Sequence, residues 1–138
     1  MIIVQTQTTS FKKELYQAVH NLSTDTLKIA LYTGNADLNA DTTVYTTSNE
    51  VVASGYTAGG NTLTGVAISS SGSTAYVNWA NTSWTAALTA RCALIYNVTQ
   101  GNKSIAVIDF GADKTSTTTF TITMPSNTST TALIRSSN

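Results

Sequence analysis

Apolar and polar residues alternate along most of this chain, and one segment near its start follows a helical spacing instead. The segment TTSFKKELYQAVHNL opens with threonine and serine, which are the residues preferred at helix N-caps. Its apolar residues recur at helical intervals and form a single face: Phe11, Leu15, Ala18, Val19 and Leu22. This pattern predicts a short helix over residues 10–22, preceded by an extended arm over residues 1–9.

The rest of the chain follows the two-residue period of β-strands. Two of the predicted strands, 89–98 and 103–111, are apolar on both faces, which is typical of central strands, and VTQGNKS between them has the chemistry of a hairpin turn. Residues 26–33 alternate more cleanly and are expected to be half-buried. The predicted strands are 26–33, 50–54, 62–71, 74–80, 89–98, 103–111, 118–125 and 130–136.

This spacing of strands and turns predicts one all-β domain. A two-sheet β-sandwich of about eight strands, either jelly-roll or immunoglobulin-like, fits a strand every ten or so residues. We expect residues 10–138 to form this sandwich with the helix packed against it, and residues 1–9 to form the arm. The chain of 138 residues is long enough for one hydrophobic core.

The glycine-rich stretch GYTAGGNTLTG, from Gly55 to Gly65, raises the question of a phosphate-binding loop. Such a loop needs a helix directly after the glycines, so that the helix N-terminus faces the anion. The residues that follow alternate and are rich in β-branched side chains. We therefore interpret Gly59 and Gly60 as turn residues with positive φ, and Gly65 as a bulge or a close backbone approach.

Composition and charge narrow the classes of partner. Lysine plus arginine and aspartate plus glutamate each number 7, so the formal net charge is zero. No basic stripe is present to follow a phosphate backbone, and no segment is long and apolar enough to cross a membrane or to serve as a signal peptide. Threonine makes up about a fifth of the chain. A neutral surface gives little electrostatic repulsion between molecules, which favours a role in an assembly.

Few residues suggest a catalytic or binding role. Asp109 in a predicted buried strand needs a cationic partner, for which Arg91 and Lys114 are the candidates. The single cysteine, Cys92, has apolar neighbours and is expected to be a buried small side chain. The single histidine, His20, is expected to be a partly exposed helix residue near the helix C-terminus.

Two further groups leave alternatives open. The loop containing Asp37 and Asp41 offers oxygen ligands that could hold calcium, although it lacks the bidentate glutamate of helical calcium loops. Trp79 is in phase with core positions, whereas Trp84 is either a core residue or part of a sugar-binding platform. We predict no catalytic, cofactor-binding or metal-binding residue, and no enzymatic activity.

Several segments in a fixed order carry a family resemblance: SFKKELYQAVHNLSTDTLKIALYT, TSNEVVASGYTAGGNTLTGVAIS, TAYVNWANTSWTAALTARCALIYN and KSIAVIDFGADKTS. In these segments the chain resembles a family of small structural proteins of tailed bacteriophages, from Ser10 to Arg135. The resemblance implies a virion component without catalytic activity. It further implies a capsid decoration or cement protein on the capsid surface, made in the bacterial host cytoplasm, that binds the major capsid protein and stabilises the shell.

The resemblance and the composition together suggest a homo-oligomer, with a trimer favoured, and no nucleic-acid or membrane partner. Ile2, Ile3 and Val4 are the candidate assembly interface, because these β-branched residues have no evident local partner and could add a strand to a neighbouring subunit. One alternative is a component associated with the tail, neck or fibre of the same virion. Another is a carbohydrate-binding module on the virion surface, which requires Trp84 to be solvent-exposed.

Overall fold

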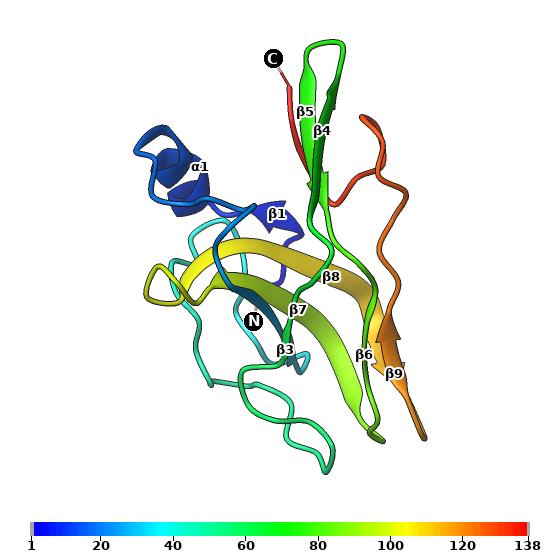
Figure 1. The fold of residues 1–138 in the computed structure, drawn as a ribbon. Helices are drawn as coiled ribbons and strands as arrows, with labels where there is room; N and C mark the ends of the chain where they lie inside the picture. Colours follow the sequence, from blue (N-terminus) through cyan, green and yellow to red (C-terminus); the bar gives the residue numbers. More distant parts are fainter. Residues whose placement is uncertain (1, 138) are drawn as a thin grey trace.

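The computed structural model describes residues 2–137, and in it strands predominate (Figure 1). The one helix is α1, Thr9–Tyr16. A five-stranded antiparallel sheet with the order β1-β8-β7-β2-β3 forms the centre. Its strands are β1 (Thr6–Gln7), β2 (Leu27–Tyr32), β3 (Asn61–Thr62), β7 (Thr89–Asn97) and β8 (Lys103–Thr115). The prediction of an all-β chain with one N-terminal helix is confirmed.

The layer that covers one face of the central sheet is divided. One part is a three-stranded sheet, β10-β5-β4, and the other is the two-stranded pair β6-β9. The bounds are β4 Ala67–Ser71, β5 Thr74–Asn78, β6 Thr82–Trp84, β9 Phe120–Ile122 and β10 Ile134–Ser136. Side chains from both parts share one hydrophobic core with the central sheet. The architecture is therefore sandwich-like, but with three sheets where two were predicted.

The central sheet is buried on both faces. Ile29 and Leu31 of β2 point into the core under the divided layer, whereas Ala30 and Tyr32 belong to a second apolar cluster on the opposite face. Loop residues, including Leu38, cover that opposite face. The prediction that residues 26–33 are half-buried was therefore wrong, because a long irregular segment covers the face that was expected to meet water.

Helix α1 ends earlier than the predicted range of 10–22. Thr8 caps its start, since its Oγ1 accepts from the backbone amide of Phe11 at 3.3 Å. At the other end Ala18 adopts φ 57°, and the amides of Ala18 and Val19 donate to the carbonyls of Leu15 and Glu14. This is the Schellman arrangement, which usually has glycine at the left-handed position. With alanine there, the sequence gives no stop signal.

Strand boundaries differ from prediction where the chain turns sharply. Residues 50–54 form isolated bridges and not a strand, and the predicted strand 62–71 is divided into β3 and β4 around Gly65, which has φ 65°. Strands β1 and β6 were not predicted, since each has only two or three residues. The β7–β8 hairpin turn was predicted, and positive φ at Gly101 and Asn102 confirms it.

The glycine pair forms a tight turn against the central sheet, as expected. Gly59 and Gly60 have φ of 100° and 79°. A Cβ atom on Gly60 would lie 1.8 Å from the carbonyl oxygen of Ile29 in β2, and β3 starts at the next residue, Asn61. Position 60 therefore requires glycine for its backbone angle and for the close approach.

Replacing Ala18 by glycine should stabilise the protein. In the left-handed region an alanine side chain costs about 1 kcal/mol, and glycine avoids this cost. We expect Ala18→Gly to raise the free energy of unfolding by up to about 1 kcal/mol in urea titrations. The matched control is Gln17→Gly, because Gln17 has φ −93° and gains nothing there. Equal effects of the two substitutions would contradict this account of the helix end.

Replacing Gly60 by alanine should destabilise the protein strongly, since the new methyl group would meet backbone atoms of β2. We expect a loss of about 3 kcal/mol or more in the free energy of unfolding. Gly72→Ala is the control, because Gly72 also has positive φ, at 59°, but a Cβ atom there would meet nothing within 4 Å. Thermal unfolding of both variants separates the effect of the steric clash from that of the backbone strain. If Gly60→Ala lost as little stability as Gly72→Ala, the close approach of residue 60 to β2 would be disproved.

Candidate functional site: the N-terminal arm and the β8–β9 cleft

The N-terminal arm runs along its own chain. The amide of Val4 donates to the carbonyl of Leu38, and the amide of Leu38 donates to the carbonyl of Ile2, each at 3.0 Å. The amide of Ile2 also donates to Asp37 Oδ1 at 2.6 Å. Further along, β1 pairs with β8. The arm therefore has local backbone partners that the sequence did not reveal.

The three candidate interface residues differ in exposure. Ile3 is partly buried against the cluster on the loop-covered face of the sheet. Ile2 is 62% exposed and Val4 is 46% exposed. A backbone already held within the chain leaves side-chain contacts as the means of binding another molecule. Ile2 and Val4 thus present apolar side chains on a fixed strand-like support.

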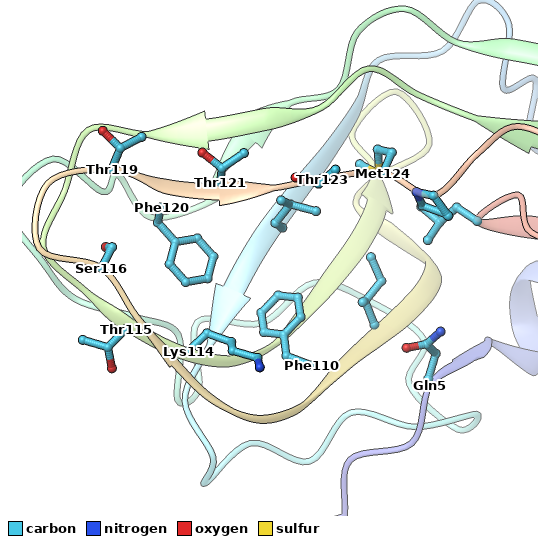
Figure 2. A pocket seen from close by; sticks show the side chains of 14 residues that line it. Gln5, Phe110, Lys114, Thr115, Ser116, Thr119, Phe120, Thr121, Thr123 and Met124 are labelled. Atoms are coloured by element: carbon cyan, nitrogen blue, oxygen red, sulfur yellow. The ribbon is translucent and has the colours of Figure 1, made fainter.

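A cleft of about 510 Å³ lies between β8 and β9 (Figure 2). These strands are consecutive and are joined by residues 116–119, yet they do not pair with each other. Strand β9 pairs with β6, and β8 pairs with β7, so the two strands diverge from their connecting turn. Within residues 2–137, β8 and β9 are joined by a short turn as in a hairpin, but no backbone hydrogen-bond ladder connects them.

The cleft has an apolar floor and a polar rim. Phe110 and Phe120 approach each other in the floor with ring centroids 6.1 Å apart, and Ile108 and Leu133 are partly buried beside them. Threonines of the β9 segment line the rim, and Figure 2 shows the side chain of Lys114 on the β8 side of the cleft, beside Phe110. Lys114 is the one charged side chain among the lining residues.

The β8 wall of the cleft contains a large bulge. Ala90 of β7 pairs with Lys114, but Cys92 pairs with Asp109, so residues 110–113 of β8 stand opposite Arg91 alone. Gly111 in this bulge has φ 82°. Its amide donates to Asp109 Oδ1 at 2.8 Å, within the same strand. A bulge of this kind leaves its extra residues unpaired in the ladder and bends the strand that contains it.

Glu50 forms a buried polar cluster that the sequence analysis missed. Its carboxylate accepts from the hydroxyl of Tyr45 at 2.5 Å, from the hydroxyl of Tyr56 at 2.5 Å and from the amide of Gly59 at 2.7 Å. Tyr96 donates to the carbonyl of Gly59 at 2.6 Å. The side chain is only 7% exposed, and its three donors hold it in place. The geometry suits a structural carboxylate, since protein donors bond both of its oxygen atoms.

His20 forms a second buried cluster. Asn97 Nδ2 donates to His20 Nδ1 at 2.9 Å and also to Asp25 Oδ2 at 2.8 Å. His20 Nε2 therefore carries the proton and donates to Glu14 Oε1 at 2.8 Å. The prediction of a partly exposed helix residue was wrong, because the helix ends at Tyr16 and the chain then folds His20 under it. The cluster joins α1 to the end of β7.

The other candidates take structural positions. Arg91 Nε lies 3.3 Å from Asp109 Oδ1, which confirms Arg91 as the predicted partner. Cys92 is fully buried, and this burial, together with the negative charge of Asp109, raises the pKa of its thiol to about 12. A thiol in that state is a poor nucleophile.

The structure also places the tryptophans and the aspartate loop. Trp79 and Trp84 are 5% and 4% exposed, so both belong to the core and neither forms a platform for a sugar. In the loop, Asp37 binds the arm as described above, and the amide of Asp41 donates to Asn39 Oδ1. Across residues 2–137, no group of three or more histidine, cysteine or acidic side chains is placed to hold a metal ion.

A scan of protein-family models, a search of curated proteins and a search of solved structures found no match to this chain. In the described part of the chain, no helix is long and apolar enough to cross a membrane.

The tyrosine cluster should make the protein sensitive to alkali. Burial, with the nearby negative charge of Glu50, raises the pKa of Tyr96 to about 12, and burial raises the pKa values of Tyr32, Tyr45 and Tyr56 as well. The unfolded chain loses these protons near pH 10, whereas the folded chain keeps them. Stability is therefore complete below pH 10 and should fall as the pH rises through 10 towards 12.

Urea unfolding at pH 8, 10 and 11, with tyrosinate absorbance recorded in parallel, measures this effect. Each buried phenol contributes at most about 1.4 kcal/mol per pH unit. Tyr96→Phe should reduce the slope, while Tyr16→Phe, at a side chain that is 93% exposed, is the control. A folded protein whose tyrosines all ionise at pH 10 would contradict the burial of the cluster.

Proposed function

We propose that this chain is a non-enzymatic structural protein of a bacteriophage virion, most specifically a capsid decoration or cement protein. It binds the shell of the major capsid protein and stabilises it, and it acts as a homo-oligomer, with a trimer favoured. Its place is the outer surface of the capsid, after synthesis in the bacterial host cytoplasm. The proposal includes no nucleic-acid partner, no membrane partner and no cofactor.

This proposal rests on two exposed apolar side chains in the N-terminal arm, whose backbone is hydrogen-bonded to its own chain. Ile2 and Val4 point away from the core while the backbone between them is bonded to Leu38. Because the backbone that carries these side chains is already held, less conformational entropy is lost when they are buried against another protein. Repeated on every copy around a symmetric shell, such small contacts add up to strong attachment.

The polar clusters also support a non-enzymatic role. Glu50 and His20 are the buried groups best suited to acid–base chemistry. Glu50 accepts three hydrogen bonds from protein donors, and both ring nitrogens of His20 are bonded to protein atoms. A general acid or base must reach a substrate proton directly or through one water molecule. These two groups instead stabilise the fold.

For the finer fold type, a jelly-roll or immunoglobulin-like sandwich remains our proposal. The order β1-β8-β7-β2-β3 places strands that are distant in sequence beside one another, as Greek-key connections do. The division of the second layer into two sheets is compatible with either type.

The alternative within the same class is a component of the tail, neck or fibre. The N-terminal arm would then contact a neighbouring subunit in a ring of the tail or neck, and not the capsid shell. The carbohydrate-binding alternative required an exposed Trp84, and the burial of that side chain removes its basis.

The copy number of the chain per virion tests the proposed function directly. Quantitative mass spectrometry against the major capsid protein should give hundreds of copies, with a ratio near one to one or one trimer per local symmetry axis. Six or twelve copies would move the protein to the tail or neck. Its absence from purified virions would overturn the proposal.

Charging the arm should weaken attachment to the particle. We expect the double substitution Ile2→Asp and Val4→Asp to weaken binding to particles that lack the protein by at least about tenfold, because two carboxylates would be buried in an apolar contact. Co-sedimentation with such particles measures the binding. Val52→Asp is the matched control, since Val52 is 97% exposed and does not belong to the arm. Equal binding of the double variant and the control would exclude the arm from the interface.

A further inference from the structure

We propose that the β8–β9 cleft receives an extended strand of the protein shell to which this chain attaches. The occupant pairs with the free edge of β9, places apolar side chains on the floor of the cleft and presents a carboxylate to Lys114. The statement that the strand comes from the protein shell rests on the proposed function. The statement of how the strand is bound rests on the residues of the cleft.

The free edge of β9 provides the backbone recognition. Phe120–Ile122 pairs with β6 on one side only, and Figure 2 shows β9 lying between β6 and the cleft. A strand edge without a partner presents amide and carbonyl groups that another extended chain can bind. Adding a strand to such an edge is a common way in which proteins bind extended peptides.

The opposite wall does not compete for that edge. The arm pairs with β8 only at Ala106 and Val107, and the side chain of Gln5 accepts from the amide of Asp109. Beyond that point β8 continues to pair with β7, whereas β9 pairs with β6 in a different sheet. The two walls of the cleft therefore belong to separate sheets, and β8 does not pair with the edge of β9 that faces the cleft.

The side chains of the cleft define the rest of the occupant. The floor of Phe110, Phe120, Ile108 and Leu133 accepts apolar side chains, which an extended strand supplies at alternate positions. Because Lys114 is the one charged lining residue, charge complementarity calls for an acidic group at that end. The volume of about 510 Å³ lies within the range of peptide and ligand sites.

Titration of the isotope-labelled protein with synthetic peptides, followed by amide NMR, tests the proposal. The probe is acetyl-TVTVTE-amide, compared with acetyl-TVTVTK-amide and with a TVTVTE peptide that is N-methylated at alternate amides. We expect shifts confined to residues 108–116 and 119–124, and binding about two- to fivefold weaker for the lysine peptide. N-methylation should abolish binding up to about 1 mM, because it removes the donors that pair with a strand edge.

Charge reversal supplies the matched variant. Lys114 is exposed, so Lys114→Glu should fold normally and should prefer the lysine peptide over the glutamate peptide. Phe110→Ser should weaken both peptides by reducing the apolar floor. Absence of shifts at the cleft, or equal binding of the N-methylated peptide, would overturn the inference.

Two other outcomes also decide against it. Cleft shifts that depend on the protein's own concentration would assign the cleft to a second copy of the chain. Shifts on the free β4 edge would place strand addition elsewhere. Neither result changes the copy number per virion, so failure of the cleft and failure of the proposed function remain distinguishable.

Discussion

The buried carboxylate of Glu50 is the interaction on which the loop-covered side of the molecule depends. Between β2 and β3 the chain runs from Thr33 to Gly60 without a regular strand, and this segment must still cover one face of the central sheet. Glu50 gathers two tyrosine hydroxyls and the amide of Gly59 around one point. A buried carboxylate with three donors is stable only while all of them are present, so the segment is held in one arrangement.

This cluster is also connected to the central sheet. The amide of Leu31 in β2 donates to the hydroxyl of Tyr56, and Tyr96 of β7 donates to the carbonyl of Gly59. The stacked rings of Tyr45 and Tyr96, with centroids 4.6 Å apart, cover the apolar residues beneath. The glycine turn is thus positioned from both sides, which explains why it can approach Ile29 so closely. The motif that suggested a phosphate loop instead anchors a loop to a sheet.

Much of the fold could be predicted because it depends on local patterns. The long strands β2, β7 and β8 and the turn between β7 and β8 follow from alternation and turn chemistry. The end of α1 could not be predicted, since Ala18 occupies a position where glycine is usual. Glu50 was missed because its partners are set by the path of an irregular loop. The cleft was missed because β8 and β9 belong to separate sheets, and the alternation pattern does not show which strands pair with each other.

The free edges of β4 and β9 lack the charged residues and proline that usually protect exposed strands. Proteins usually protect exposed strand edges with charged residues, proline or bulges that twist the edge away. Here β4 is exposed along its whole length and consists of alanine, isoleucine and serine, and β9 has threonine at its centre. The formal net charge of zero adds no general repulsion. Two such edges would promote unwanted association in a protein that worked as a free monomer. In the symmetric assembly that we propose, they would instead be surfaces that neighbouring molecules cover.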